Sequence, residues 1–189
     1  QNAKGAERDT VIAYMKKGLE GILKRGETNP FLNGVPFIWC SNNLVAAAIT
    51  QCRLYQQLTG SDEFAEMEAS LRDWLFGCNP WGTSMIVGLP SWGDYPEDPH
   101  SSYRDGGKKL AATPGGLVDG PVYSTIYNGL IGIRLSKEDV YAPFQTTLCV
   151  YHDDYGDYST NEPTMDGTAS LSFYLSAMQQ MGQKQAEGK

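Results

Sequence analysis

Basic side chains and long apolar runs are scarce in this sequence, and each scarcity excludes a class of partner. Lysine and arginine number 15 against 22 acidic residues, which gives a formal net charge of −7. Phosphate groups would repel such a chain, so we expect neither nucleic acid nor membrane as a partner. No stretch approaches the roughly 18 apolar residues of a transmembrane span, and no charged-then-apolar signal segment opens the chain. We expect a soluble chain that begins at Gln1 because it is processed, cut or expressed as a fragment.

Cysteine is also scarce, with four residues and no Cys-x-x-Cys pair. Structural zinc sites use closely spaced pairs, so none is expected. The even number permits two disulfides, but we favour free buried thiols. Asp153, Asp154 and Asp157 offer oxygen ligands for calcium, yet they lack the glycine and the acidic spacing of an EF-hand loop. We expect no metal and no cofactor, with calcium kept as an alternative.

Apolar residues recur at helical spacing in three segments of the first 77 residues. The predicted helices cover roughly 11–26, 41–60 and 61–77, with Ser41 or Asn42 capping the second. The second helix is apolar nearly all round, as an inner helix of a barrel would be. Short connections without alternating strands predict antiparallel helices of bundle or toroid type.

The pattern changes in the second half of the chain. Residues 79–120 show no sustained period, and stretches that long inside a compact domain are usually functional. Residues 122–133 indicate a mixture of short helix and strand. Apolar residues over 171–181 return to helical spacing, so a helix should follow Pro163. The polar residues 183–189 should form a frayed tail.

Residues 151–164 combine four carboxylates with three tyrosines. Residues 144–150 should run extended into this stretch, and Pro163 keeps Glu162 on extended backbone before the helix. Glycoside hydrolysis needs one protonated carboxyl for the leaving oxygen and one carboxylate to activate water or attack the sugar. Like charges and an apolar, tyrosine-lined pocket would keep Glu162 protonated, whereas a helix N-terminus opposes this. Taken alone, Glu162 could instead cap the helix.

Five residues of this stretch stand in a recognisable order: Tyr151, Asp153, Tyr158, Glu162 and Thr164. This order resembles the C-terminal active-site signature of glycoside hydrolase family nine, which contains inverting cellulases and related exo-acting enzymes on an (α/α)6 barrel. The resemblance implies that Glu162 is the general acid and that Asp153 orients or electrostatically tunes the site. Without the resemblance, Asp153 would be interpreted as a loop or Asx-turn residue. Thr168 departs from the family's usual asparagine, although Ala169 matches.

A second group of motifs lies upstream: Gly77-Cys78-Asn79-Pro80-Trp81-Gly82, Met85-Ile86-Val87-Gly88 and Asp98-Pro99-His100. These resemble the family's other C-terminal signature, in which the histidine lies in the sugar subsites near the scissile bond. The resemblance implies that His100 contacts sugar, whereas by itself it would be a turn residue. Ser102 replaces an arginine that helps to hold the sugar, so substrate preference should differ. Asp119 stands in a similar loop where glycine is common.

Aromatic side chains are candidates for stacking on pyranose rings. The candidates are Trp39, Trp81, Trp92, Tyr95, Tyr103 and Tyr158. Some of these must be core residues, and we favour Trp39 and Trp92 as platforms. Together with Tyr158 and Asp157 they form our predicted substrate-binding set. Trp74 lies on a helical stripe and should pack in the core, and His152 should be structural.

The water-activating aspartate of the family belongs to an N-terminal segment with two aspartates three apart, and no such motif occurs upstream here. The barrel also needs twelve helices, and only four or five are predicted. The resemblance thus implies that residues 1–189 are the C-terminal portion of a single (α/α)6 catalytic domain, partnered by its N-terminal portion. The full enzyme should be extracellular or periplasmic and should hydrolyse a β-linked oligo- or polysaccharide with inversion, its two carboxyls roughly 6.5–9.5 Å apart. The isolated chain should have little activity.

Two alternatives remain. The first is a helical carbohydrate-binding or scaffolding module without catalysis, in which Glu162 would be exposed and unshared. The second is a polysaccharide lyase, which is less favoured because an acidic cleft repels anionic sugars.

Overall fold

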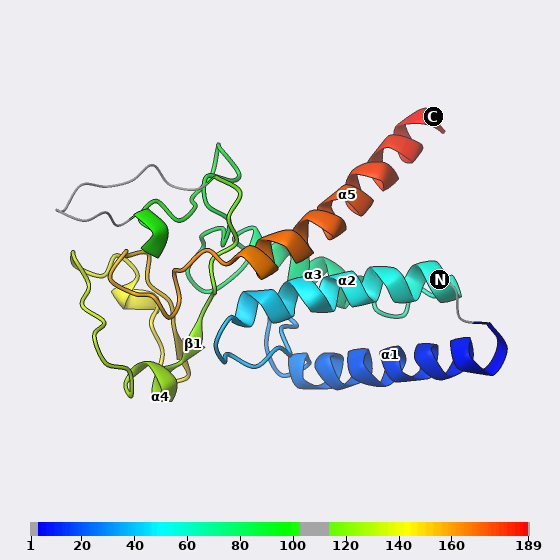
Figure 1. The fold of residues 1–189 in the computed structure, drawn as a ribbon, viewed down its shortest axis with the longest axis horizontal. Helices are drawn as coiled ribbons and strands as arrows, with labels where there is room; N and C mark the ends of the chain where they lie inside the picture. Colours follow the sequence, from blue (N-terminus) through cyan, green and yellow to red (C-terminus); the bar gives the residue numbers. More distant parts are fainter. Residues whose placement is uncertain (1–3, 103–113, 189) are drawn as a thin grey trace.

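The chain forms a helical part and a loop-rich part. The computed structural model describes residues 4–102 and 114–188. Figure 1 shows long helices on one side and mostly loops on the other. The longer helices are α1 (Gly5–Gly26), α2 (Ser41–Thr59), α3 (Ala65–Leu75) and α5 (Met165–Glu187). The shorter elements are η1 (His100–Ser102), β1 (Val122–Tyr123), α4 (Ser124–Tyr127), η2 (Ala142–Phe144) and β2 (Cys149–Val150).

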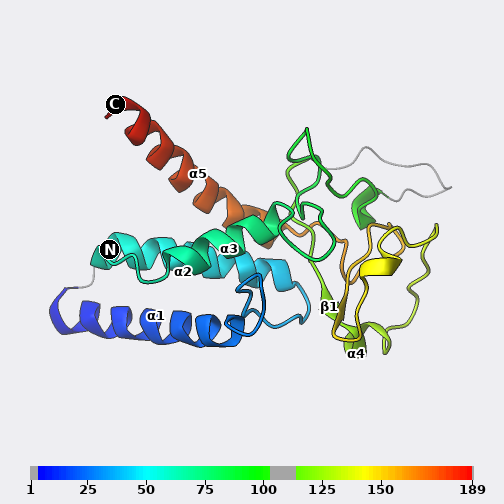
Figure 2. The same cartoon turned by 180° about the vertical axis from the view of Figure 1, so that it is seen from behind.

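α2 is the central helix of the helical part. It packs against α1, α3 and α5, and Figures 1 and 2 show α1 and α5 on opposite sides of it. Val45, Ile49 and Cys52 are each 2% exposed or less, so the prediction of a helix buried on several sides is confirmed. Leu44 is 38% exposed, so the described residues leave this one leucine of α2 partly uncovered.

The first two helices end at or beside a glycine, close to the predicted ends at residues 26 and 60. A Cβ on Gly26 would lie 2.4 Å from the carbonyl oxygen of Leu32, so the chain can turn back closely only at a glycine. Gly60 follows α2 with φ 76°, a left-handed conformation that glycine adopts at little cost.

The start of α2 differs from the prediction. Neither Ser41 nor Asn42 caps the helix, which begins at Ser41 without a side-chain cap. Ser41 Oγ donates to the carbonyl of Pro121 at 2.7 Å, and Asn42 Nδ2 donates to that of Val118 at 2.9 Å. These side chains therefore tie the head of α2 to the loop-rich part.

The loop-rich part contains a short two-stranded antiparallel sheet. Val122 of β1 pairs with Val150 of β2, and α4 follows β1, which confirms the mixed prediction over 122–133. The extended run predicted over 144–150 is wrong except at β2. Thr146 interrupts it, because its hydroxyl accepts two backbone amides and closes a turn.

A chain of packed rings joins the two parts. Trp74 is 2% exposed and contacts the rings of Phe31, Phe37 and Trp81 at centroid distances of 5.5, 5.9 and 6.1 Å. Trp81 in turn meets Tyr151, which is fully buried, at 5.6 Å. Trp74 is a core residue, as predicted. The polar stretch that begins at Tyr151 is thus anchored to the helices.

α5 extends further than the sequence predicted. Residues 183–187, expected to fray, are helical. Gln, Lys, Ala and Glu have high helix propensity, so the segment forms a helix although its side chains are polar. The buried residues of α5 are Gly167, Leu171 and Tyr174, all in its first half. Figures 1 and 2 show its second half leading away from α2.

All four cysteines are free, as favoured from their spacing. Cys52 and Cys149 are buried, but Cys78 is exposed and Cys40 only partly covered, so the predicted burial holds for two of them. Among the described helices, none has the length and apolar character needed to cross a membrane.

Candidate active site

Glu162 lies on the extended segment that leads into α5. Its carbonyl accepts from the amide of Asp119 at 2.9 Å, and the amide of Thr164 donates to Leu117 at 3.2 Å. The extended backbone predicted for Glu162 is confirmed. The residue at the N-cap of α5 is Thr164, so Glu162 does not cap the helix. Its side chain is exposed, and the described residues do not form the tyrosine-lined pocket expected around it.

Asp153 joins the two predicted signatures. Its carboxylate accepts the amides of residues 97–98, both at 2.9 Å, and Nδ2 of Asn161 at 3.1 Å. The amide of His100 donates to the carbonyl of Asn161 at 2.8 Å. Because Asn161 precedes Glu162, these bonds hold the loop of His100 beside the segment of Glu162. Asp153 is 8% exposed, so its geometry suits orienting the site better than contacting a sugar.

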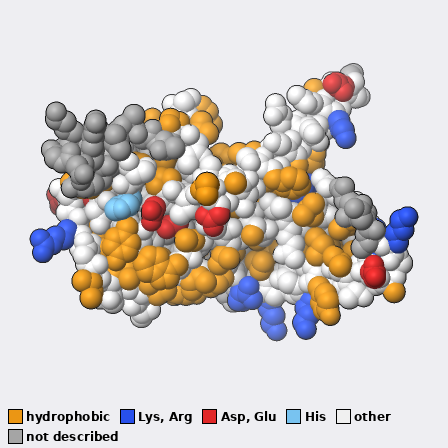
Figure 3. Space-filling model, in the orientation of Figure 1, with side chains coloured by type: hydrophobic (Ala, Val, Ile, Leu, Met, Phe, Trp, Pro, Cys, Tyr) orange, Lys and Arg blue, Asp and Glu red, His pale blue; other side chains and the backbone are white. Residues whose placement is uncertain are grey.

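Trp39, Tyr158 and His100 form a row of rings, which we call the ring row. Trp39 and Tyr158 stack with centroids 6.2 Å apart, and His100 meets Tyr158 edge-on at 6.3 Å. His100 Nδ1 lies 2.6 Å from the carbonyl oxygen of Tyr155. A carbonyl only accepts, so Nδ1 carries the hydrogen of this bond, and in a neutral imidazole Nε2 is then the acceptor. Trp39 is 44% exposed, and Figure 3 shows a histidine among apolar and acidic side chains on one face.

The other predicted platforms are placed differently. Trp92 is 88% exposed on the loop between α3 and η1, and the ring contacts within the described residues do not include it. Trp81 is 4% exposed and belongs to the core. Tyr95 is half-buried, and Tyr103 lies outside the described residues. The structure therefore brings Trp39, Tyr158 and His100 together and leaves Trp92 apart.

Asp157 is fully buried, so its predicted contact with substrate is wrong. Its oxygens accept His152 Nδ1 at 2.7 Å, Ser159 Oγ at 2.6 Å and Thr160 Oγ1 at 2.8 Å. Burial alone would raise the pKa of Asp157, but these hydrogen bonds outweigh it and lower the pKa below its usual value. Asp157 anchors the turn that carries Tyr158, and His152 is structural, as predicted.

The carboxylates that a calcium site would require accept hydrogen bonds from other groups of the protein. Asp154 accepts the amides of Ser136, Lys137 and Gly156 at 2.7, 3.2 and 2.7 Å. Within the described residues, no three His, Cys, Asp or Glu side chains are grouped so that they could hold a metal ion. The arrangement therefore gives the calcium alternative no support.

Three carboxyl groups gather where α2 and α5 begin, and we call Asp119, Glu162 and Asp166 the acidic cluster. Burial raises the pKa of Asp119 to about 6, and the charges of Glu162 and Asp166 act in the same direction. Hydrogen bonds with Cys40 and Thr164 act against them. Burial also raises the pKa of Cys40 to about 12, with contributions from all three carboxyls. The acidic cluster thus acts on Asp119 and on Cys40.

Almost the whole chain matches one family. Residues 4–175 fit the profile described as Glycosyl hydrolase family 9. The chain belongs to glycosyl hydrolase family 9. Its fold is similar to AaCel9A in complex with cellobiose-like isofagomine, with a TM-score of 0.65 at 23% identity. It is also similar to a metagenome-derived glycoside hydrolase family 9 endoglucanase (0.64, 23%) and to a thermostable endoglucanase from Alicyclobacillus acidocaldarius (0.65, 24%).

These similarities cover most of this chain but a minor part of the family 9 structures. They include 93%, 92% and 92% of this chain and 32%, 29% and 32% of the other chains, in the same order. The chain thus spans about a third of their length. Its fold is mainly helical and forms part of the family's (α/α)6 toroid, as predicted. None of the curated proteins matches the sequence.

Asp119 is the member of the site that motif reasoning missed. The family 9 pattern commonly has glycine there, so no role was carried over to it. The available signal was local: an acidic residue within an otherwise apolar and glycine-rich run, residues 115–121. An uncompensated acid in such a run is either exposed or electrostatically perturbed.

Proposed function

We propose that Glu162 is the general acid of a family 9 enzyme that hydrolyses a β-linked glucan with inversion, and that this chain supplies the acid and part of the cleft. One observation carries the proposal: the backbone hydrogen bond from His100 to Asn161 holds the segment of the exposed Glu162 beside the loop of His100, whose ring belongs to the ring row. The similar structures support the substrate class, since two are endoglucanases and one binds cellobiose-like isofagomine.

The site residues divide the chemistry as follows. A sugar ring stacks on Trp39, His100 Nε2 accepts a hydrogen bond from a sugar hydroxyl, and Glu162 protonates the departing glycosidic oxygen. Inversion requires a second carboxylate roughly 6.5–9.5 Å away to activate water on the opposite face of the sugar. Asp153 and Asp157 are buried and hydrogen-bonded, so neither serves as that base. We assign the base to an N-terminal portion of the same domain.

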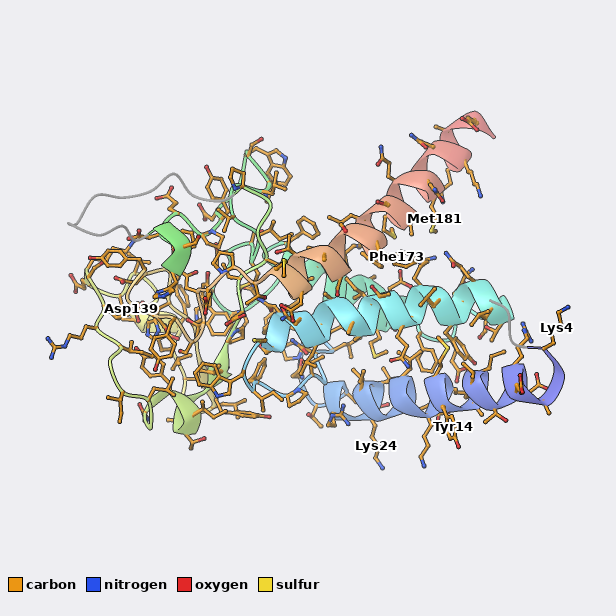
Figure 4. The ribbon with its side chains drawn as sticks, viewed as in Figure 1. Lys4, Tyr14, Lys24, Asp139, Phe173 and Met181 are labelled. Carbon is orange, nitrogen blue, oxygen red and sulfur yellow. The ribbon has the colours of Figure 1, made fainter. Side chains whose placement is uncertain are left out.

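An open groove between α2 and α5 offers a surface to which such an N-terminal portion can bind. It has a volume of about 680 Å³ and is lined by Thr50, Leu54, Gln57, Phe173, Ser176, Ala177 and Gln180. Phe173 is 47% exposed, and Figure 4 shows Phe173 and Met181 on α5 where this helix diverges from α2. A complete toroid needs further helices, and this chain spans about a third of the similar structures. Helices of the N-terminal portion are the occupant we propose for the groove.

The test uses the full-length enzyme, meaning the polypeptide with both portions of the domain. The wild type should release a sugar of inverted anomeric configuration from cello-oligosaccharides, as observed by NMR. Glu162→Gln should lower kcat by about 100-fold to 10,000-fold, the usual contribution of a general acid. Glu66→Gln, which neutralises an exposed carboxylate in the first turn of α3, should retain the wild-type rate.

Each result bears on a different part of the proposal. Full activity of Glu162→Gln removes the acid assignment, and a retained anomeric configuration removes inversion. A full-length wild type that binds cello-oligosaccharides without hydrolysing them indicates the non-catalytic carbohydrate-binding module.

A further inference from the structure

Residues 131–137, which we call the strap, lie against the turn that carries Tyr158. The hydroxyl of Tyr158 donates to the carbonyl of Ile131 at 2.9 Å. A Cβ on Gly156 would clash with the carbonyl oxygen of Arg134, so the strap can approach this turn closely only because a glycine stands there. Neither family signature includes the strap. The strap thus contacts both the turn and one ring of the ring row.

One buried carboxylate holds the strap and the turn together. Asp154 is 2% exposed. Its Oδ2 accepts the amide and the hydroxyl of Ser136 at 2.7 and 2.8 Å, and the amide of Lys137 at 3.2 Å. Its Oδ1 accepts the amide of Gly156 at 2.7 Å. One oxygen of Asp154 therefore binds the strap, and the other binds the turn.

The strap fixes the orientation of Tyr158, which is the central ring of the ring row. The Tyr158 ring lies nearly parallel to Trp39, at 13°, and meets His100 at 70°. The bond from its hydroxyl to Ile131 holds the far end of the side chain. Without that bond, a sugar that binds at the row would have to order the ring, and ordering a side chain on binding lowers affinity. The strap therefore orders the row in advance.

We propose that Asp154 is a positioning residue for the ring row: it holds the strap, and the strap holds the Tyr158 hydroxyl, so the row is ordered before a sugar binds. The inference rests on the proposed function, because it takes the ring row as a sugar-binding surface. Asp154 is buried, so it acts through the strap and does not contact substrate. It should therefore affect the binding of substrate and leave the proton transfer from Glu162 unchanged.

The test is a double-mutant cycle in the full-length enzyme with Asp154→Asn, Tyr158→Phe and the variant that combines them. Tyr158→Phe keeps the ring and removes only the hydroxyl that bonds to Ile131. Each single variant should raise KM for cello-oligosaccharides about threefold to tenfold with little change in kcat, as expected for one lost hydrogen bond. The combined variant should have a KM no higher than the worse single variant, because both changes act through the same bond. Asp9→Asn, an exposed carboxylate on α1, should keep the wild-type KM.

The combined variant decides whether Asp154 acts through Tyr158. If the two increases in KM multiply, the two residues act independently and the inference is overturned. An unchanged KM in Asp154→Asn overturns it as well, and so does a loss that falls mainly on kcat, which indicates a disturbed site. Thermal unfolding checks that each variant is folded. If Asp154→Asn is not folded, Ser136→Ala takes its place in the cycle with the same criteria, since it removes only one hydroxyl that donates to Asp154.

The outcomes also separate this inference from the proposed function. Full activity of Glu162→Gln overturns the acid assignment, while the KM values of the cycle still decide the role of Asp154. A wild type that neither binds nor hydrolyses cello-oligosaccharides overturns the proposed function and this inference with it.

Discussion

At the scale of single residues, exposure separates the side chains that can meet a substrate from those that hold the site. Asp157 and Tyr158 are sequence neighbours, yet the Asp157 side chain is buried and accepts five hydrogen bonds, whereas the ring of Tyr158 joins the ring row. No regular period runs through residues 151–164, so the sequence could not assign inward and outward positions there. The family motif indicated that residues 151–164 contain site residues, but it could not indicate which of their side chains point inward.

Trp39 should contribute to substrate binding more than to the chemical step. Because stacking on its ring acts on bound substrate and transition state alike, Trp39→Ala in the full-length enzyme should raise KM for cello-oligosaccharides about threefold to tenfold with little change in kcat. Trp39→Phe keeps an aromatic ring and should lose less. Steady-state kinetics test this, and an unchanged KM in Trp39→Ala would remove Trp39 from the cleft.

At the scale of helices, apolar periodicity predicted which segments are helical but not how they are joined. Glu68 of α3 is 4% exposed and accepts Arg53 Nε of α2 and the Tyr174 hydroxyl of α5, both at 3.0 Å. Glu68 and Arg53 lie beside the apolar residues of their helices without interrupting the helical spacing of those residues. The sequence pattern therefore does not indicate that the two side chains pair. The buried pair connects the helices that position the heads of α2 and α5.

Breaking this pair should destabilise the fold. Glu68→Gln leaves the Arg53 guanidinium buried without its counter-charge, so the free energy of unfolding should fall by about 3 kcal/mol. Glu66→Gln on the same helix removes an exposed carboxylate and should change it by less than about 0.5 kcal/mol. Urea denaturation compares the two variants. Equal stability would show that the pair does not hold the helices together.

At the scale of the whole molecule, two family signatures in order predicted the toroid, whereas composition alone gave only a helical domain. The signatures could not indicate which surfaces this chain leaves open. The groove of about 680 Å³ and the exposed side chains of Leu44 and Phe173 are examples of such open surfaces. In our proposal they are open because the helices of the N-terminal portion are not part of this chain. The exposure of Glu162 has the same cause in our proposal, since an N-terminal portion would complete its pocket.

We predict that the isolated chain does not hydrolyse an aryl β-glycoside and that adding the N-terminal portion as a separate polypeptide restores turnover. Phe173→Asp places a charge in the groove and should prevent restoration, because burying an unpaired charge is unfavourable. Lys24→Asp on α1, whose side chain points away from α2 in Figure 4, should not. Turnover by the chain alone, or restoration with Phe173→Asp, would contradict the groove as the docking surface.

Proton transfer from Glu162 to the leaving oxygen can be measured by comparing two substrates in full-length Glu162→Gln. A cello-oligosaccharide needs protonation of its leaving group, whereas the dinitrophenolate group of a dinitrophenyl cellobioside leaves without it. We predict a loss in kcat of about 100-fold or more on the first substrate and less than about tenfold on the second. Equal losses on both substrates would show that Glu162 does not protonate the leaving group.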